Sequence, residues 1–205
     1  CKYFPTGAKL NVYESLFDLF MKAKSNEFLL DSPLNFLPRC IIASFFDSLK
    51  EVRMETEANR QKRENLIVAS KKLLNITLAD LSKGLGMLLN HQQSYIVSCI
   101  KLLQQLLNFL GIDCSDCIEG VYKLMVNIIF HLPNYMEDAI FVLITICELN
   151  IPSLKVPEFL DSVMNCCQHA MTSGNPYLIG KGALLLGRLF IFMKQMGERF
   201  LMDCL

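Results

Sequence analysis

The chain has 205 residues, of which 52% are hydrophobic and 20% are charged, and this composition excludes an intrinsically disordered protein. Its 20 Lys and Arg residues balance its 20 Asp and Glu residues, so the formal net charge is zero. Proteins that bind nucleic acid usually carry a basic excess that neutralises phosphates, so this balance argues against nucleic acid as a ligand.

The number and positions of the cysteines indicate the redox state of the cellular compartment in which the protein functions. There are nine, an odd number, and several occupy apolar positions of predicted helices, as Cys99 and Cys147 do. This usage is typical of a reducing environment, so we expect an intracellular protein, cytoplasmic or nuclear. The longest unbroken apolar runs, 139–144 and 182–187, are far shorter than the roughly 18–20 residues of a membrane span, so we expect no membrane partner. Because the chain begins with Cys1, we expect a fragment of a longer protein.

Two amphipathic helices are predicted in the first 50 residues, one over about 9–24 and one after Pro38. Between Lys50 and Glu64, nine of fifteen residues are Lys, Arg or Glu. Oppositely charged residues at helical spacing, such as Glu57 and Arg60, favour a solvated helical extension. A charged finger that binds a partner is the alternative.

From residue 64 onward the apolar pattern predicts seven helices and no strand. A three-helix unit is expected at about 64–76, 78–90 and 94–110, followed by two-helix units at 116–131 with 134–149 and at 157–171 with 175–195. Asp116 and Asn134 each precede a Glu by three residues, which is capping-box spacing. Asn175 precedes a Pro at the first helical position. Residues 198–205 are expected to form a separate short helix.

Histidine and tyrosine recur together. His91 and His131 are 40 residues apart, and Tyr135 and Tyr177 are 42 apart. Arrays of helical repeats have periods of about 40–47 residues. Because successive histidines are one repeat apart, they cannot share one metal ion, and we interpret each as a helix C-terminal residue favoured by the dipole.

The last helix of each unit carries a small residue followed by a leucine. Aligned on Ser94, Asn134 and Asn175, the small residues are Cys99, Ala139 and Gly180, and the leucines are Leu103, Leu143 and Leu184. This pattern resembles the third helix of an armadillo repeat over about residues 64–195. The resemblance implies an all-α, armadillo/HEAT-like α-solenoid of about four helical repeats. Residues 1–63 would be a divergent N-terminal repeat with its charged extension at 50–64, and residues 64–205 the regular repeats.

No set of residues predicts catalysis. Cys114 and Cys117 form a lone CxxC, which lacks both the βαβ setting of a redox motif and a second ligand pair for zinc. Cys166, Cys167 and His169 are the only further zinc candidates, and they belong to the next repeat. The glycines match no phosphate-binding loop, and no nucleophile elbow is present. We therefore expect no catalytic residue, no cofactor and no metal, and a protein that is not an enzyme.

The outward stripes of the aligned helices form the predicted protein-binding surface, for which a solvated face without a ligand is the alternative. In the first two units these residues are Ser98, Lys101, Gln105, Asn108, Asp138, Phe141, Thr145 and Glu148. The third stripe is apolar: Ile179, Gly182, Leu186 and Leu189. The final helix is apolar almost all round, so Leu186, Leu189 and Phe190 complete the predicted binding residues. We expect this end to pack against another chain, a second copy or a missing continuation of this chain.

The predicted function is that of an intracellular scaffold or adaptor that binds a partner peptide or helix on its solenoid surface, as the resemblance implies. A regulatory helical-repeat domain of a larger enzyme complex is the first alternative. A helical repeat that binds nucleic acid is the second, but it needs basic side chains at successive equivalent positions, where Lys101, Phe141 and Gly182 stand.

Overall fold

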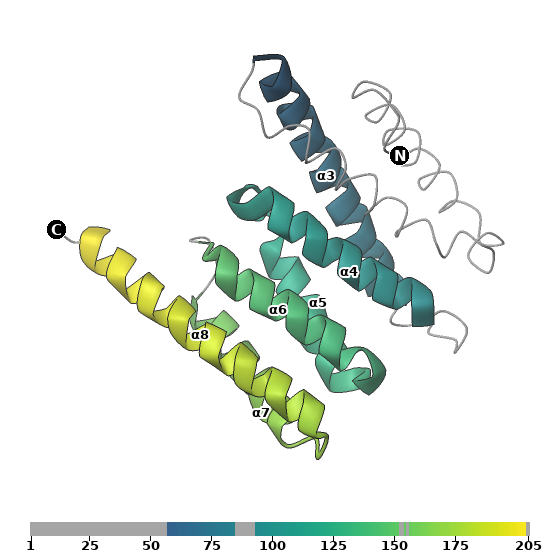
Figure 1. Cartoon of the computed structure of the whole chain (residues 1–205), viewed down its shortest axis with the longest axis vertical. Helices are drawn as coiled ribbons and strands as arrows, with labels where there is room; N and C mark the ends of the chain where they lie inside the picture. The colour runs from purple at the N-terminus through teal and green to yellow at the C-terminus, as the bar shows by residue number, and fades with distance from the viewer. Residues whose placement is uncertain (1–56, 85–92, 152–153, 155, 204–205) are drawn as a thin grey trace. The chain divides into compact units, whose positions relative to one another are not determined.

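The computed structural model describes residues 57–84, 93–151, 154 and 156–203. These residues form six α-helices and two short 3-10 helices, with no strand among them (Figure 1). The prediction of an all-α fold is therefore confirmed for this part of the chain. The two helices predicted before residue 50, the start of the charged segment and His91 lie outside the described residues.

The chain divides into two compact units, residues 1–105 and 106–205. The division falls inside helix α4 (Gln93–Leu110). Helix α3 (Glu57–Gly84) runs without a break through residues 63 and 64, where the sequence predicts a boundary between domains.

In the first unit, α3 replaces two predicted helices. The expected break near residue 77 is absent: the helix continues, and the buried Thr77 hydroxyl is satisfied inside it by donating to the Leu73 carbonyl at 2.8 Å. Over residues 64–84 and 93–110, the described part of the predicted three-helix unit, the structure has the two helices α3 and α4. The charged segment is helical from Glu57 to Glu64, where Arg60 and Glu64 form an ion pair at 3.5 Å. The helical interpretation of this segment is correct over those residues.

The second unit follows the predicted order of helices. A 3-10 turn, η3 (Gly111–Cys114), joins α4 to α5, and a second, η4 (Pro133–Tyr135), joins α5 to α6. The α-helices are α5 (Ile118–His131), α6 (Met136–Leu149), α7 (Val156–Met171) and α8 (Pro176–Asp203). Because α8 runs on to Asp203, the separate short helix predicted after residue 197 is wrong.

Two of the three predicted helix caps are wrong. The α5 and α6 helices begin after Cys117 and Tyr135, and neither has a side-chain cap hydrogen bond. The 3-10 helix η4 contains Asn134, the cap predicted for α6, while Asp116, the cap predicted for α5, lies in the turn of residues 115–117 that follows η3. The third cap is right, since Asn175 Oδ1 accepts a hydrogen bond from the Tyr177 amide at 3.0 Å.

The helices of the second unit form two pairs, α5 with α6 and α7 with α8. The corresponding helices of the two pairs also contact each other, α5 with α7 and α6 with α8 (Figure 1). Three buried aromatic rings, one each from α5, α7 and α8, contact one another edge to face. The ring centroids of Tyr122 and Phe159 are 5.3 Å apart, and those of Phe159 and Phe192 are 5.4 Å apart. This aromatic cluster fixes how α5, α7 and α8 meet.

Candidate protein-interaction surface

Three side-chain contacts join α6 to α8, and each links residues that are 40 positions apart. The pairs are Glu137 with Tyr177, Phe141 with Lys181, and Glu148 with Arg188. In the first pair the tyrosine hydroxyl donates to the carboxylate at 2.7 Å. In the second the ammonium lies 4.1 Å from the ring centroid, and in the third the guanidinium Nε lies 3.2 Å from the carboxylate. We call these six side chains the α6/α8 ladder.

The ladder lies at the solvent edge of the two helices. The Arg188 and Glu148 side chains are 43% and 45% exposed, and an ion pair so exposed stabilises by only about 0.2–1 kcal/mol. The main stabilisation of this contact comes from the buried face of α8, which includes Leu185, Leu189 and Phe192. The ladder therefore adds little to the stability of this contact, and it presents charged and aromatic groups to solvent along the edge of α6 and α8.

The predicted binding residues of α4 do not all face outward. Lys101 and Asn108 are exposed and Gln105 is half-buried. Ser98 is buried, which corrects its assignment to the surface stripe. The stripe was assigned by its spacing from the predicted cap at Ser94, and a serine at such a position is small enough to enter a helix interface.

The α6 stripe needs one correction. Glu148 is exposed, while Asp138 and Phe141 are half-buried. Thr145 is buried, and its hydroxyl donates to the Phe141 carbonyl at 3.1 Å. Because this bond satisfies the hydroxyl within its own helix, the threonine enters the interior without an unmet polar group.

The predicted stripe on α8 faces the wrong way. Leu189 is buried and Leu186 half-buried, so of the three predicted binding residues only Phe190 is exposed. Gly182 packs on α7, where an added Cβ would lie 3.0 Å from the Ala170 Cβ. A stripe that includes Gly182 and Leu189 therefore lies on the inner side of α8.

The error is one of alignment. Pairing Asn134 with Asn175 shifts α6 by 41 residues, whereas a shift of 42, the spacing of the two tyrosines, superimposes the burial patterns. One residue rotates a helical stripe by about 100°, because 3.6 residues make a turn. With the 42-residue shift, buried Ile140, Leu143 and Cys147 correspond to buried Gly182, Leu185 and Leu189.

The two described histidines lie where they were expected. His131 is the last residue of α5, with Nδ1 3.0 Å from the Asn127 carbonyl oxygen. His169 is in the last turn of α7, where its ring lies 4.9 Å from that of Phe130. The helix C-terminal placement is confirmed for both. Among the described residues no group of three His, Cys, Asp or Glu side chains lies close enough to hold a metal ion.

The cysteines of the described part form no disulfide. The Cys114 thiol donates to the Gly111 carbonyl at 2.9 Å, and the Cys117 thiol donates to the Cys114 carbonyl at 3.1 Å. Burial raises the pKa of Cys147 and Cys166 to about 12 and that of Cys167 to about 11. These three thiols are therefore protonated at neutral pH and poor nucleophiles.

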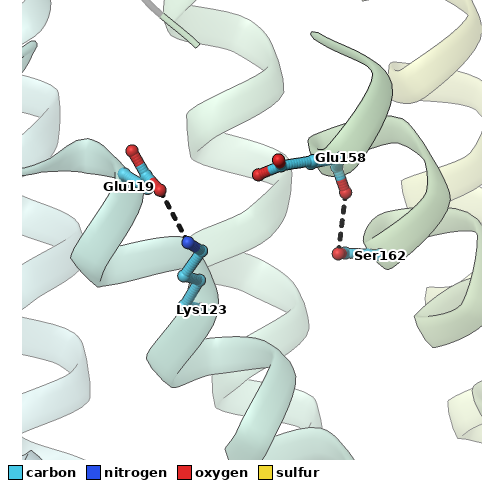
Figure 2. Close-up of polar contacts among 4 residues, drawn as sticks. All are labelled: Glu119, Lys123, Glu158 and Ser162. Atoms are coloured by element: carbon cyan, nitrogen blue, oxygen red, sulfur yellow. Dashed lines mark hydrogen bonds and ion pairs between the residues drawn. The ribbon is translucent and has the colours of Figure 1, made fainter. Parts of the chain in front are cut away.

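A polar patch marks the α5/α7 side of the unit (Figure 2). Lys123 and Glu119 form an ion pair at 2.6 Å, and this bond is the main cause of the raised pKa of Lys123. Beside it, the Ser162 hydroxyl donates to the Glu158 carbonyl at 2.8 Å. Beneath the patch the Tyr122 hydroxyl is buried and has no hydrogen-bond partner in the described structure. Burial is the main cause of the raised pKa of this tyrosine.

Two helices of the described part are long and apolar enough to span a membrane by length and composition: Ile96–Cys114 and Pro176–Gly197. Counting only unbroken apolar runs missed both. Half of the first window is buried in the fold, as in the core helix of a globular domain, which passes the same test. Only 22% of the second is buried, so α8 carries an unusually exposed apolar surface.

Sequence reasoning missed most of the ladder, because it compared equivalent positions of aligned helices and did not look for complementary side chains 40 positions apart on different helices. Glu137 with Tyr177 and Glu148 with Arg188 are complementary pairs at 40 residues, and this signal was available in the sequence. No protein-family model, no curated protein and no solved structure matches the chain. Function is therefore inferred from the surface itself.

Proposed function

We propose that this chain is a non-catalytic protein-interaction scaffold or adaptor, built as an armadillo/HEAT-like solenoid, that holds a peptide segment or a helix of a partner protein. The observation that carries the proposal is the α6/α8 ladder. Its contacts join residues 40 positions apart, within two residues of the 42-residue shift that superimposes α6 on α8, and a solenoid is expected to stack equivalent helices at about its repeat period. The pairings of α5 with α7 and of α6 with α8 also fit an array in which each repeat touches its neighbours.

The partner would bind along the solvent edge of the ladder. Phe141 and Tyr177 flank the Lys181 ammonium, at 4.1 Å and 4.9 Å from the ring centroids, so a cation and two rings are held together. Asp138 and Glu148 add carboxylates on α6. Fixed groups of both charges beside rings suit an extended segment or helix anchored by alternate side chains. Lys101 and Gln105 belong to the first unit, so their predicted role in protein binding is a separate proposal from the ladder.

The thiols support a proposal for the cellular setting. We propose that the protein is cytoplasmic or nuclear, because its cysteines serve as small apolar side chains, as they do in reducing compartments. Cys99, Cys147, Cys166 and Cys167 are all buried in the helical core, which supports this usage.

A charge-exchange variant tests the proposal. Asp138→Lys combined with Lys181→Glu exchanges one acidic and one basic charge at the ladder edge of α6 and α8 at constant net charge, and Asp161→Lys combined with Lys72→Glu is the matched control at exposed positions that are not part of this edge. Circular dichroism first checks that both variants fold. Affinity purification of the intact protein identifies its partners, and calorimetry then measures how tightly each purified partner binds. We expect a partner that binds the wild type and the control equally well and binds the ladder variant at least tenfold more weakly. If every specific partner binds the ladder variant as tightly as the wild type, the ladder is not the binding surface.

A further inference from the structure

The polar patch between α5 and α7 brings two carboxylates and one ammonium group together. Glu119 and Lys123 lie on α5 and form an ion pair at 2.6 Å. Glu158 lies in the first turn of α7, and its carboxylate points across to that pair (Figure 2). Its charge also helps to raise the pKa of Lys123, for which the hydrogen bond to Glu119 is the main cause. Two carboxylates and one ammonium group leave one negative charge in excess.

A buried hydroxyl lies beneath the patch. Tyr122 is 1% exposed, and its ring packs edge to face on Phe159, the residue after Glu158. Its hydroxyl has no hydrogen-bond partner in the described structure. Burial is the main cause of its raised pKa, and the charges that also shift this pKa belong to Lys123, Glu119 and Glu158. The hydroxyl therefore faces the patch with its capacity to donate and to accept both unmet.

The helix ends explain the carboxylates only in part. Glu119 and Glu158 each lie in the first turn of a helix, where a negative charge offsets the helix dipole. That role needs neither a carboxylate pointed at the neighbouring helix nor an unsatisfied hydroxyl beneath it. Among the described residues the Glu158 carboxylate forms no hydrogen bond or ion pair, and the Ser162 hydroxyl bonds to its backbone carbonyl instead. One carboxylate and one hydroxyl are thus left for a donor from outside the chain.

The donor that fits is a guanidinium group. Its planar fork offers five N–H groups, enough for two carboxylates and a further acceptor, and it is less strongly hydrated than an ammonium group. A metal ion fits less well, because no three His, Cys, Asp or Glu side chains of the described residues gather to hold one. We propose that Glu119, Glu158 and the Tyr122 hydroxyl bind the guanidinium group of an arginine side chain of a partner protein. The tyrosine then accepts an N–H bond and donates its own O–H to a carboxylate.

Lys123 competes with the arginine for Glu119, and it is easily displaced. The side chains of Lys123 and Glu119 are 56% and 45% exposed, and an ion pair so exposed contributes little stability. Exposed side chains change rotamer within picoseconds to nanoseconds, so their rotation opens the way to the hydroxyl beneath them. The arginine replaces one exposed ion pair with bonds to two carboxylates and to a hydroxyl that is unsatisfied in the free protein.

Nitrogen-15 chemical shifts of the 205-residue chain test the site, with N-acetyl-argininamide as the probe. Amides of residues 119–123 and 158–162 should shift, with a dissociation constant on the order of 1–10 mM. N-acetyl-citrullinamide, a neutral molecule of the same shape, should not shift them at the same concentrations, and equal binding of the two would overturn the proposal. A pentapeptide with a central arginine should bind at least as tightly as the amide. Weaker binding of the pentapeptide would assign the site to a free guanidine and not to a protein.

Two variants should change the affinity in opposite directions. Glu158→Gln should weaken arginine binding at least fivefold, because it removes a carboxylate. Its control is Asp161→Asn on the same helix, since Asp161 is exposed and is not among the charges that shift the Tyr122 pKa. Lys123→Met removes the competing cation and should strengthen binding several-fold. Normal binding by Glu158→Gln, or no gain in Lys123→Met, would overturn the proposal.

Tyr122→Phe distinguishes a binding role of the hydroxyl from a structural one. Loss of an unsatisfied buried hydroxyl should raise the melting temperature of the free protein, by up to about 4 °C, and should weaken arginine binding at least threefold. A variant that binds like the wild type, or that melts at a lower temperature, would exclude the hydroxyl from the site and overturn the proposal. The site is separate from the ladder, so Asp138→Lys with Lys181→Glu should bind N-acetyl-argininamide normally, and failure of one proposal does not decide the other.

Discussion

Lys181 on α8 holds its ammonium group 4.1 Å from the ring centroid of Phe141 on α6, and the two residues are 40 positions apart in the chain. Both side chains are half-buried, so the ion is partly removed from water while facing the negative face of the ring. The contact joins two helices whose own sequences differ, and it fixes how far one slides along the other.

A double-mutant cycle measures this contact. Phe141→Leu and Lys181→Met keep most of the apolar volume and remove the ring and the charge, respectively. We expect a coupling free energy of about 0.5–1 kcal/mol from urea unfolding of the two single variants and the double variant. A coupling indistinguishable from zero would mean that Lys181 is solvated and that the register depends on apolar packing alone.

Two glycines of α8 should respond in opposite directions to the same substitution. Gly182→Ala places a methyl group 3.0 Å from the Ala170 Cβ and 3.2 Å from the Cys167 carbonyl oxygen, so α7 and α8 must separate and the domain should lose about 1–3 kcal/mol. Gly180→Ala meets open space and should gain up to about 1 kcal/mol in helix propensity. Thermal unfolding at low protein concentration compares the pair. Equal effects would place both glycines in the same environment.

The helices of the second unit were predictable because their apolar residues recur at helical spacing, and α7 and α8 begin within one residue of the expected positions. The helix break near Thr77 was wrong, because a threonine hydroxyl can bond to its own helix and does not stop it. The predicted start of α6 falls in a 3-10 helix and that of α5 in the turn of residues 115–117, and the capping-box rule foresees neither.

The predicted surface was less accurate than the helices. To predict which residues of a helix face outward, the helix phase must be known to within one residue, and the cap-based alignment was wrong by one. The prediction therefore placed Gly182 and Leu189 on the outer side of α8, whereas both are buried in the fold. Ser98 and Thr145 were assigned outward by their spacing from the aligned caps at Ser94 and Asn134. Burial of a small hydroxyl depends on the neighbouring helix, and a single-helix pattern contains no information about that neighbour.

The repeat pattern predicts that a small residue is needed at position 139 of α6, and a larger side chain at that position tests this prediction. Ala139 is fully buried in α6, so Ala139→Leu forces a larger side chain into a filled space and should destabilise by about 1–3 kcal/mol. Glu148→Ala removes an ion pair that is nearly half exposed and should cost less than about 1 kcal/mol. Urea unfolding of both variants ranks them. An Ala139→Leu variant as stable as the wild type would reveal unfilled space beside α6.

The buried thiols predict a loss of stability at alkaline pH. The pKa of Cys166 rises from 9.0 to about 12 on folding because burial disfavours the thiolate, so the folded state holds its proton more tightly than the unfolded state. This contribution is fully present below pH 9 and is lost as the pH rises toward 12, with a slope of at most about 1.4 kcal/mol per pH unit for one thiol. Cys166→Ala should flatten the fall in unfolding free energy between about pH 8 and pH 10, relative to the wild type. Parallel pH profiles for the two proteins would show that this thiol does not titrate differently on folding.

The last prediction concerns the hydroxyl of Tyr122, which is buried against Phe159 without a hydrogen-bond partner in the described structure. An unsatisfied buried hydroxyl costs on the order of 1–3 kcal/mol, whereas the ring itself contributes favourable packing. Tyr122→Phe keeps the ring and removes the hydroxyl, so the domain should become more stable, by up to about 1 kcal/mol in urea unfolding. Tyr135→Phe is a suitable control, since Tyr135 is also buried and its pKa is also raised by burial. If Tyr122→Phe instead lowers the unfolding free energy by more than about 1 kcal/mol, the hydroxyl has a partner such as an ordered water beneath the Glu119–Lys123 pair.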